Sequence, residues 1–490
     1  MFYLIMLAEM LLGTLSAIYF LRSMHMFQLN SYRTDTHSIW LFKNSYKIFF
    51  SFKATKAKKP LVYTHRVIRM CVTAVIIYLA MVAVLVFCVR HWAIPIVLPF
   101  SPIFPIIANI INAPIEKINN NRYINDAKRI IDSMPNLITI GITGSYGKTS
   151  TKYFLHKMLS SKYITLMTPE SYNTTLGVVK TIRNELRPIH EVFICEMGMK
   201  WKGDIKELCD IAKPKHSMIT SIGPQHLETM KTQENIIEEK FSITNSITEG
   251  ICFLNYDNEF IKNQKIDKNI IKYGIHEQNS DYQATDISVS EKGTRFTVRA
   301  LCKNTEQEES AVFETALIGS HNVQNIVGSI AVAHTLGISL NELVLPVKRL
   351  EGAPHRLQIS HSGNTIIIDD SFNSNPIGAK AALDVLKMFH GTKILITPGM
   401  VELGTESYRL NKELGVNAAS SCDYALLIGQ KQAPPIKEGL LEGKFPEDKI
   451  HIFDSFNDGM KFANELVTKT DNNPLGKKVI LIENDLPDNY

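Results

Sequence analysis

The sequence has few cysteines and lacks any arrangement of them that binds a metal. Seven cysteines are scattered over 490 residues, and none lies in a CxxC pair. The common zinc and thiol redox sites need two cysteines at such close spacing. We therefore expect free, buried thiols of the kind found in a reducing cytoplasm.

A large excess of one charge sign is also lacking, as are internal repeats and low-complexity tracts. The chain has 53 Lys and Arg against 48 Asp and Glu, a formal net charge of +5. The charge is uneven, because residues 22–69 carry ten basic residues and one acid, Asp35. A basic segment between apolar runs is typical of membrane topology, so we expect a membrane lipid environment and no nucleic-acid partner.

Length and composition indicate a globular protein of two or three domains. The chain is 45% hydrophobic and 21% charged, which is ordinary for a folded chain. Apolar runs are concentrated in residues 1–112, whereas residues 113–490 have the composition of a soluble α/β protein.

Residues 1–112 are predicted to form a membrane region with three spans. Residues 71–89 form an uncharged run of nineteen residues, about the length that crosses a bilayer core. Residues 2–21 form a second apolar run, and no small-residue cleavage site follows it, so we interpret it as an anchor. Residues 92–111 form a third apolar run that four prolines interrupt, and it either crosses or is re-entrant.

The basic segment then sets the expected orientation. Positively charged loops stay on the cytoplasmic side, which places residues 22–69 in the cytoplasm. If the third run crosses, everything after residue 112 is cytoplasmic as well. We therefore expect a multi-pass protein of the cell membrane whose domains after residue 112 face the cytoplasm.

A glycine-rich loop with the context of a phosphate-binding loop follows a short apolar run at residues 137–143. The loop is Gly144-Ser145-Tyr146-Gly147-Lys148-Thr149-Ser150-Thr151, and a helical pattern begins directly after it. Glycines let backbone N–H groups approach phosphates, and a helix N-terminus favours an anion. Lys148 is placed to reach the β- and γ-phosphates of a nucleotide, and the Thr149 hydroxyl to bind Mg²⁺. The nucleotide-binding candidates here are Gly144, Ser145, Gly147, Lys148, Thr149 and Ser150.

The run GITGSYGKTST at residues 141–151 is similar to the nucleotide loop of the Mur ligases, and further motifs of that family follow in chain order. They are closest to the branch that adds D-alanyl-D-alanine to a UDP-muramoyl tripeptide. The resemblance implies an ADP-forming ligase that uses ATP and Mg²⁺. Such an enzyme activates a carboxylate as an acyl phosphate and joins it to an amine.

Within the predicted ATP-binding domain, the resemblance implies four further roles. Asn173 would lie beside the γ-phosphate, and Glu196, at the end of a buried strand, would bind Mg²⁺. His226, in a Gly-Pro-x-His-Leu turn, would be a metal ligand. Lys240 would react with CO₂ to give a carbamate that helps to hold a second Mg²⁺. A polar turn, a helix cap, a structural histidine and a surface lysine are the alternative interpretations.

Farther along the chain, the resemblance assigns residues to the base, the phosphates and the amine. Asn322, in a GxHNxxN motif, would contact the nucleotide base. Arg356 would reach the γ-phosphate, for which the planar guanidinium suits the phosphate oxygens. The run DDSFNSNP at residues 369–376 places Asp370 at the ribose or phosphates. Asn373 and Asn375 would contact the amine substrate.

Taken together, the resemblance assigns catalytic roles to Lys148, Lys240, His226 and Arg356. Thr149, Glu196, His226 and carbamylated Lys240 are the candidate magnesium ligands.

The soluble part is predicted to contain two α/β domains. Residues 122–352 form a central P-loop ATP-binding domain, and residues 281–317 within it alternate as an antiparallel meander does. Residues 354–490 alternate strand-like and helical runs, which predicts a Rossmann-like, doubly wound domain. The strand-like runs are residues 365–370, 392–397, 424–428, 450–453 and 478–482. The overall expectation is an α/β protein behind N-terminal transmembrane helices.

The sequence departs from the family pattern in three places. The membrane region stands where this branch has its UDP-sugar domain, Pro398-Gly399 replaces the usual Gly-Asp, and residues 483–490 lack the usual KGSR-like loop. The last two departures fall in the domain that selects the amine. The carboxylate donor therefore remains open between UDP-linked, lipid-linked and polymeric forms, and the amine between an amino acid and a dipeptide.

We expect a ligase of cell-wall peptide synthesis at the cytoplasmic face of the membrane. A ligase that extends a capsule or polyglutamate-type polymer is the first alternative. An inactive scaffold that binds a nucleotide is the second.

Overall fold

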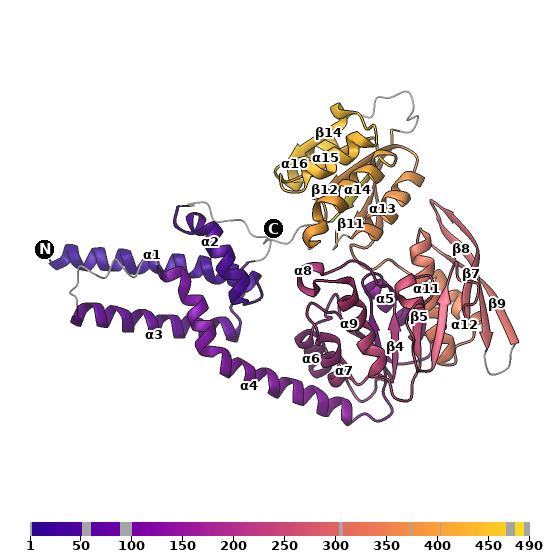
Figure 1. Cartoon of the computed structure of the whole chain (residues 1–490), viewed down its shortest axis with the longest axis horizontal. Helices are drawn as coiled ribbons and strands as arrows, with labels where there is room; N and C mark the ends of the chain where they lie inside the picture. Colours follow the sequence, from indigo (N-terminus) through magenta and orange to yellow (C-terminus); the bar gives the residue numbers. More distant parts are fainter. Residues whose placement is uncertain are drawn as a thin grey trace. The chain divides into compact units, whose positions relative to one another are not determined.

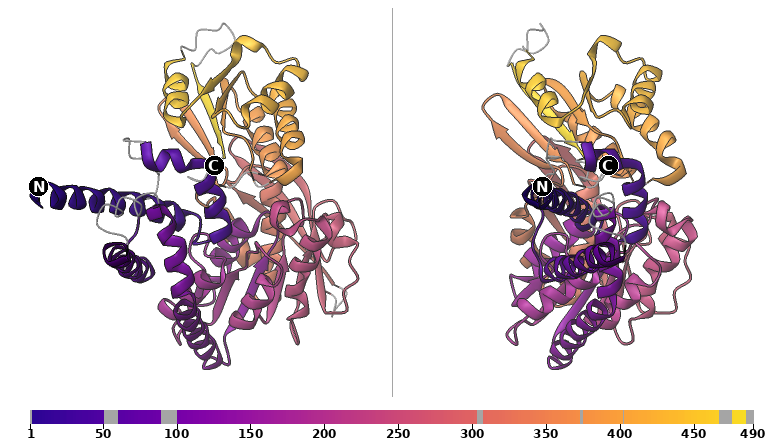
Figure 2. Two further views of the ribbon diagram at one scale, coloured as in Figure 1. Left: turned by 60° about the vertical axis from the view of Figure 1, so that its left-hand side comes forward. Right: turned by 90° about the vertical axis from the view of Figure 1, so that its left-hand side faces the viewer.

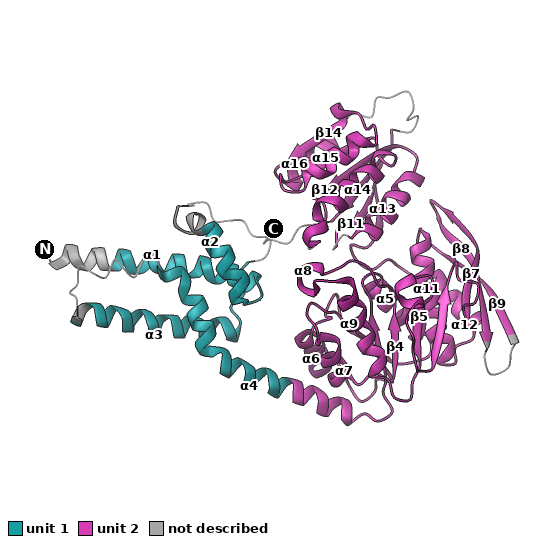
Figure 3. Ribbon diagram, in the orientation of Figure 1, with its two compact units in different colours: residues 1–123, 486–490 teal, residues 124–485 magenta. Residues whose placement is uncertain are grey.

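The computed structural model describes residues 2–50, 60–88, 100–302, 307–372, 375–401, 403–466 and 476–484. The chain divides into an N-terminal unit up to Tyr123 and a larger unit spanning Ile124–Asp485 (Figure 3).

The N-terminal unit is helical in the part that the structure describes. Its helices are α1 (Phe2–Leu29), α2 (Thr34–Phe50), α3 (His65–Cys88) and the first part of α4 (Phe104–Asp132) (Figure 1). Their buried residues form one apolar cluster, made up of Phe20, Met24, Phe27, Val67, Met70, Ala74, Phe104 and Ala108. Polar contacts join the same helices, among them an ion pair of 2.6 Å between Arg69 and Glu116.

One helix among the described residues, α3 over His65–Leu85, is long and apolar enough to cross a membrane. Several of its large side chains are exposed within the unit, including Val75, Ile76 and Leu79. The predicted span at residues 71–89 overlaps this helix. Residues 2–21 of the predicted first span belong to α1. Residues 92–99 of the predicted third span lie outside the described residues, so the arrangement with three spans stays a prediction.

The larger unit begins with a nine-stranded sheet, among the described residues, in the order β2-β3-β1-β4-β5-β6-β7-β8-β9 (Figure 1). Neighbouring strands from β2 to β7 run parallel, and β8 and β9 complete an antiparallel meander. The strands are β1 (Ile138–Thr143), β2 (Thr165–Met167), β3 (Val192–Glu196), β4 (His216–Ile219), β5 (Cys252–Asn255), β6 (Ile270–Gly274), β7 (Tyr282–Ser290), β8 (Gly293–Cys302) and β9 (Gln307–Thr315).

Two apolar cores hold helices against this sheet. One core contains α5 (Lys148–Leu159), α11 (Ser320–Thr335) and α12 (Leu340–Lys348). The other contains α6 (Thr175–Asn184), α7 (Asp204–Ala212), α9 (Gln233–Asn245) and the end of α4. Short helices α8 (Leu227–Met230) and α10 (Glu259–Lys262) follow β4 and β5. Because β1 pairs in parallel with β3 and β4, the loops at their carboxyl ends meet at one edge of the sheet.

The rest of the larger unit is a six-stranded sheet, in the described part of the chain, in the order β10-β11-β15-β12-β13-β14. β10 is antiparallel to β11, and the other pairs are parallel. The strands are β10 (Gln358–Ser362), β11 (Thr365–Asp370), β12 (Thr392–Thr397), β13 (Tyr424–Ile428), β14 (Ile450–Phe453) and β15 (Lys478–Glu483).

Helices cover this second sheet on both faces, as a doubly wound fold requires. A large core packs α13 (Pro376–Met388), α14 (Ser407–Ala419) and α15 (Ala433–Glu442) against it. A smaller core packs α16 (Phe456–Glu465) against alternate residues of the same strands. The short 3-10 turns are η2 (Gly404–Glu406) and η3 (Glu447–Lys449). The two sheets can be followed in the turned views of Figure 2. Sheets of largely parallel strands with helices between them confirm the predicted α/β class.

Candidate active site

A cavity of about 760 Å³ receives side chains from the loops of both sheets. Its size is within the usual range for small-molecule sites. Most of the residues singled out from the sequence line it, namely Ser145, Gly147, Lys148, Thr149, Ser150, Asn173, Glu196, His226, Lys240, Asn322, Arg356, Asp370 and Asn375. Gly144 lies beside the lining residues, at the end of β1, and Asn373 lies outside the described residues.

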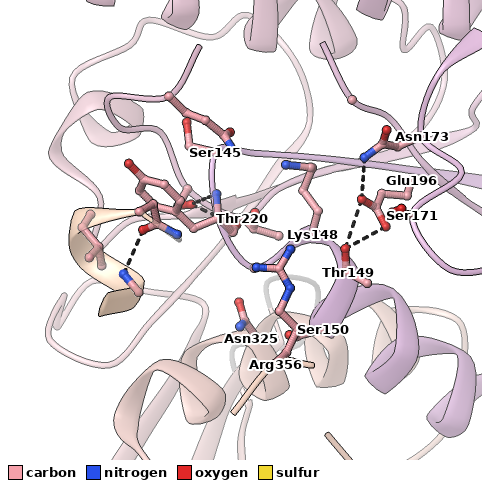
Figure 4. Close-up of a pocket in the computed structure, with 18 of the residues that line it drawn as sticks. Ser145, Lys148, Thr149, Ser150, Ser171, Asn173, Glu196, Thr220, Asn325 and Arg356 are labelled. Atoms are coloured by element: carbon pink, nitrogen blue, oxygen red, sulfur yellow. Dashed lines mark hydrogen bonds between the residues drawn. The ribbon is translucent and has the colours of Figure 1, made fainter. Parts of the chain in front are cut away.

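The phosphate-binding loop joins β1 to the N-terminus of α5 (Figure 4). Gly147 precedes the helix with φ 79°, a left-handed conformation that side chains disfavour. A β-carbon there would also lie 2.5 Å from Asn325 Oδ1. Glycine is therefore required, and the N–H groups of the first turn of α5 remain available to an anion.

Lys148 starts α5 and turns its amine back over the loop. Its Nζ donates a hydrogen bond of 2.7 Å to the carbonyl oxygen of Gly144. Burial lowers the pKa of Lys148 to about 8, which the negative charge of Glu196 partly opposes and the positive charge of Arg356 reinforces. A phosphate group is the kind of partner that would restore the charged form of such an amine.

Glu196 ends β3 as a buried carboxylate, 1% exposed. Thr149 Oγ1 donates to its two oxygens over 3.2 and 3.1 Å, and Asn173 Nδ2 donates over 3.0 Å, as the dashed lines in Figure 4 show. Burial alone would raise the pKa of Glu196, but the charges of Lys152 and Lys148 outweigh burial and lower it. Glu196 is therefore ionised and lies beside the phosphate-binding loop.

Lys152 is a member of this cluster that sequence reasoning missed. Its Nζ lies 3.0 Å from Glu196 Oε2, with neither side chain more than 1% exposed. The same amine donates to the backbone oxygen of Glu170, in the loop that carries Asn173. Its spacing could have identified it from the sequence, because a lysine four residues after Lys148 lies on the same helix face.

Lys240 is buried, which excludes the interpretation that it is a surface lysine. It is 1% exposed on α9, and among the described residues no hydrogen bond or ion pair engages its amine. Burial and the charge of Lys148 lower its pKa well below the ordinary value. The preceding Glu239 accepts from the backbone N–H groups of Gly203 and Ile205, each over 2.8 Å, and so fixes α9 to the start of α7.

His226 lies in the turn between β4 and α8 and lines the cavity. Its φ of 56° is left-handed, which is uncommon for a residue other than glycine. Next to it, Gln225 Oε1 is buried without a hydrogen-bond partner among the described residues. This turn therefore brings an imidazole and a buried amide oxygen to the lining of the cavity.

Asn322 lies in the first turn of α11, with 8% of its surface exposed. Its side-chain Nδ2 donates to the backbone oxygen of Ile318 over 2.9 Å, and the residue lines the cavity. His321 also lines the cavity, and burial lowers its pKa to about 4. The neutral imidazole and the amide form a polar wall suited to a nucleotide base.

Arg356 comes from the segment between the two sheets and reaches toward the loop that carries Lys148 and Thr149 (Figure 4). Asp370, at the end of β11, accepts from the backbone N–H of Leu357 over 3.1 Å. Burial raises the pKa of Asp370 to about 6, against the opposing charge of Arg356. Asn375 caps α13 by accepting from Gly378 N over 2.8 Å.

The donor set fits a magnesium nucleotide. Among the described residues no group of three or more His, Cys, Asp or Glu side chains surrounds a common point. Mg²⁺ is usually held by one or two carboxylates together with phosphate oxygens and water, so a dedicated cage is not needed. The ionised Glu196 and the Thr149 hydroxyl, next to the open N-terminus of α5, supply the protein share of such a site.

Two protein-family models match the larger unit. The Mur ligase middle domain matches residues 142–333, and the glutamate ligase domain of Mur ligases matches residues 355–472.

Characterised relatives include the UDP-N-acetylmuramoyl-tripeptide–D-alanyl-D-alanine ligase of Bacillus subtilis, 30% identical over 336 residues. The match covers 68% of this chain and 71% of that enzyme. The Escherichia coli enzyme of the same name is 28% identical over 64% of this chain and 69% of its own. A crystal structure of MurF from Acinetobacter baumannii superposes with a TM-score of 0.65 at 26% identity, covering 75% of this chain and 77% of that one.

Proposed function

Since the chain belongs to the Mur ligase family, we propose that it joins the carboxylate of a cell-wall peptide precursor to D-alanyl-D-alanine. The chain is an ATP-dependent, amide-forming ligase that uses Mg²⁺. The names of its relatives support the choice of substrates, a UDP-linked muramoyl tripeptide and a dipeptide.

The observation that carries the proposal is the convergence of Lys148, Glu196, Lys240 and Arg356 on one cavity. These residues are far apart in the sequence. Three belong to the first α/β part, and Arg356 comes from the segment that joins it to the second. Each has the charge or ligand chemistry that a nucleoside triphosphate and its metal require.

In the first step, a carboxylate oxygen of the donor attacks the γ-phosphorus of ATP. The bond between that phosphorus and the bridging oxygen breaks, and ADP leaves as the acyl phosphate forms. Phosphoryl transfer depends mostly on positioning and on neutralising charge. Lys148 and Arg356 are the cations of this chain that do so, and Asn173 and the N-terminus of α5 orient the phosphates.

In the second step, the amine attacks the acyl carbon and the bond from that carbon to the phosphate oxygen breaks. Inorganic phosphate leaves, and the nitrogen gives up a proton as the amide forms. Asn375 lines the cavity on the side of the second sheet. Its amide nitrogen is not used by the helix cap, so it can receive the dipeptide. We assign Asn373 to the same subsite.

Thr149, Glu196, His226 and the carbamate of Lys240 would hold the magnesium, which lowers the cost of bringing anionic groups together. Lys240 suits carbamate formation because burial and the charge of Lys148 lower its pKa and so favour the neutral amine, which is the form that attacks CO₂. Asp370 and Asn322 would hold the ribose and the base.

The carbamate can be detected directly. Wild-type protein in ¹³C-bicarbonate is expected to show one slowly exchanging carbamate carbon signal, which Lys240→Arg abolishes because a guanidinium does not carbamylate. The same substitution is expected to lower kcat by about 10²–10³. An unchanged signal in Lys240→Arg would assign the carbamate to another lysine.

We also propose that residues 1–112 anchor the enzyme in the cell membrane as a multi-pass region, with the catalytic domains in the cytoplasm. The helix at His65–Leu85 and the basic residues around it support the anchor. A membrane-bound enzyme meets lipid-linked precursors as readily as soluble ones, so both forms of donor belong in the assay.

The decisive experiment supplies full-length enzyme in lipid nanodiscs with ATP, Mg²⁺ and a UDP-linked muramoyl tripeptide. Release of ADP and formation of the pentapeptide, measured by mass spectrometry, should depend on D-alanyl-D-alanine. Turnover with glutamate and a growing polymer instead would favour the polymer-extending ligase. Nucleotide binding without turnover on any donor and amine would favour the inactive scaffold.

A further inference from the structure

The turn that carries Arg356 has an unusual backbone. The residues on either side of it, His355 and Leu357, have φ values of 59° and 47°. Left-handed conformations are uncommon for residues with a β-carbon, and they persist where surrounding contacts hold them. The side chain between the two is therefore presented by a turn that something else must stabilise.

The end of β11 supplies those contacts. His355 Nδ1 lies 2.7 Å from Asp369 Oδ2, and the backbone N–H of Leu357 donates to Asp370 Oδ1 over 3.1 Å. The backbone N–H of Phe372 closes the arrangement by donating to the His355 oxygen over 3.3 Å. Three contacts thus fasten the Arg356 turn to the end of β11 and to Phe372 just beyond it.

The guanidinium itself rests on an aromatic ring. Arg356 Cζ lies 4.7 Å from the centroid of the Phe372 ring. Among the described residues, no hydrogen bond or ion pair engages the guanidinium nitrogens. A carboxylate partner would also hold this group, but it would neutralise the charge and occupy the N–H fork. A ring face holds the cation and leaves both free.

We propose that Phe372 is a positioning residue that, with the His355–Asp369 pair, aims Arg356 at the phosphate being transferred. The inference rests on the role proposed above for Arg356. It also connects the two substrates, because Phe372 lies in the segment between β11 and α13 that leads to Asn375. The contact that orients the phosphate-facing arginine thus belongs to the segment that receives the amine.

Substitution of the ring tests the proposal in the full-length enzyme. Phe372→Leu keeps apolar volume and removes the ring face, so kcat/KM for ATP should fall about fivefold, the measure of one cation–π contact. Phe372→Tyr keeps the face and should stay within about twofold of wild type. As a matched control, Tyr424→Leu removes the ring that lies 5.5 Å from Lys449 Nζ, outside the cavity, and should leave the kinetics unchanged.

A double-mutant cycle separates a positioning role from a general loss of structure. In an Arg356→Gln background, which has no cation to position, Phe372→Leu should cost less than about twofold. An equal loss in both backgrounds would overturn the proposal, because the ring would then act independently of Arg356. Near-normal turnover by Arg356→Gln alone would instead contradict the proposed role of the arginine.

The second support of the turn gives an independent measurement. His355→Ala should lower kcat/KM for ATP about tenfold, because it removes the contact with Asp369. His355→Asn should restore part of this loss, since asparagine tolerates the left-handed conformation and its amide can donate to Asp369. If Phe372→Leu melts at a lower temperature than wild type, the two His355 variants provide the test instead. Equal losses of kcat/KM in His355→Ala and His355→Asn would contradict the proposal.

Discussion

At the scale of single residues, the site depends on charged groups that water does not stabilise. Lys148 is half-buried and Lys240 is buried, burial lowers the pKa of both amines, and Glu196 is a buried anion that stays ionised because cations surround it. Such groups keep their charge only through one another or through a ligand. Removing one should therefore affect turnover far more than removing an exposed charge.

Lys148→Ala should lower kcat by about 10²–10³, the usual effect of losing one preorganised electrostatic group at a reacting phosphate. Lys157, exposed on the same helix, provides the control, and Lys157→Ala should leave kcat unchanged. ADP release under saturating ATP measures both. Near-wild-type turnover by Lys148→Ala would contradict the assigned mechanism.

Glu483 is a second buried acid, at the end of β15. Its protonation can be followed through the pH dependence of the protein's stability. Burial raises its pKa to about 8 from an ordinary value of 4.5, although Thr397 Oγ1 donates to it over 2.6 Å. The folded chain thus retains a proton that the unfolded chain releases above pH 4.5. This contribution to stability is complete below about pH 4.5 and is lost as the pH rises through about 8.

Between pH 5.5 and 8.5 the melting temperature of the wild type should fall more than that of Glu483→Gln, which cannot ionise. Glu465→Gln, on the exposed side of α16, should follow the wild type. Parallel melting curves for wild type and Glu483→Gln would show that this acid does not titrate in the folded state over that range.

At the scale of helices and strands, the position of Lys240 depends on how its helix, α9, is anchored. Glu239 accepts two N–H groups at the start of α7 and is 4% exposed, whereas the preceding Glu238 pairs with Lys202 at the surface. These neighbours on one helix differ in burial and in partners. They make a matched pair for measuring how firmly α9 holds Lys240.

Glu239→Ala should destabilise the protein by about 1–3 kcal/mol, because it leaves the buried N–H of Ile205, and the N–H of Gly203 beside it, without their acceptor. Glu238→Ala should change stability by less than about 1 kcal/mol, as is usual for exposed ion pairs. Urea unfolding of the two variants measures the difference. Equal effects would mean that the N-terminus of α7 finds another acceptor.

The same scale shows how far sequence patterns predict structure. The predicted strands at residues 365–370, 392–397, 424–428 and 450–453 coincide with β11, β12, β13 and β14, because buried parallel strands are continuous apolar runs between polar turns. The site residues found in advance each belong to a local motif. Lys152 and Phe372 were missed, since their importance comes from Glu196 and Arg356, partners distant in the chain.

At the scale of the whole molecule, sequence and structure agree on two α/β parts with a helical N-terminal unit before them. Burial could not be predicted from the sequence for Lys240, because the helix that carries it has polar residues on several sides. The three-span arrangement depends on apolar runs alone, and the structure provides one helix of the required length among the residues it describes.

Membrane topology gives a prediction for the intact protein. A green fluorescent protein joined after Tyr490 should fluoresce, and alkaline phosphatase joined at the same point should be inactive, since both results require a cytoplasmic end. The fusions should remain in the membrane fraction after an alkaline wash. An active phosphatase would reverse the proposed orientation.

The groups that we propose to bind the phosphates come from two halves of the larger unit, which has a pharmacological consequence. Lys148 and Glu196 belong to one half, whereas Arg356 and Phe372 belong to the other. A small molecule bound beside the Phe372 ring would displace Arg356 from the phosphates while the nucleotide stays bound. Such an inhibitor would not compete with the high cellular concentration of ATP.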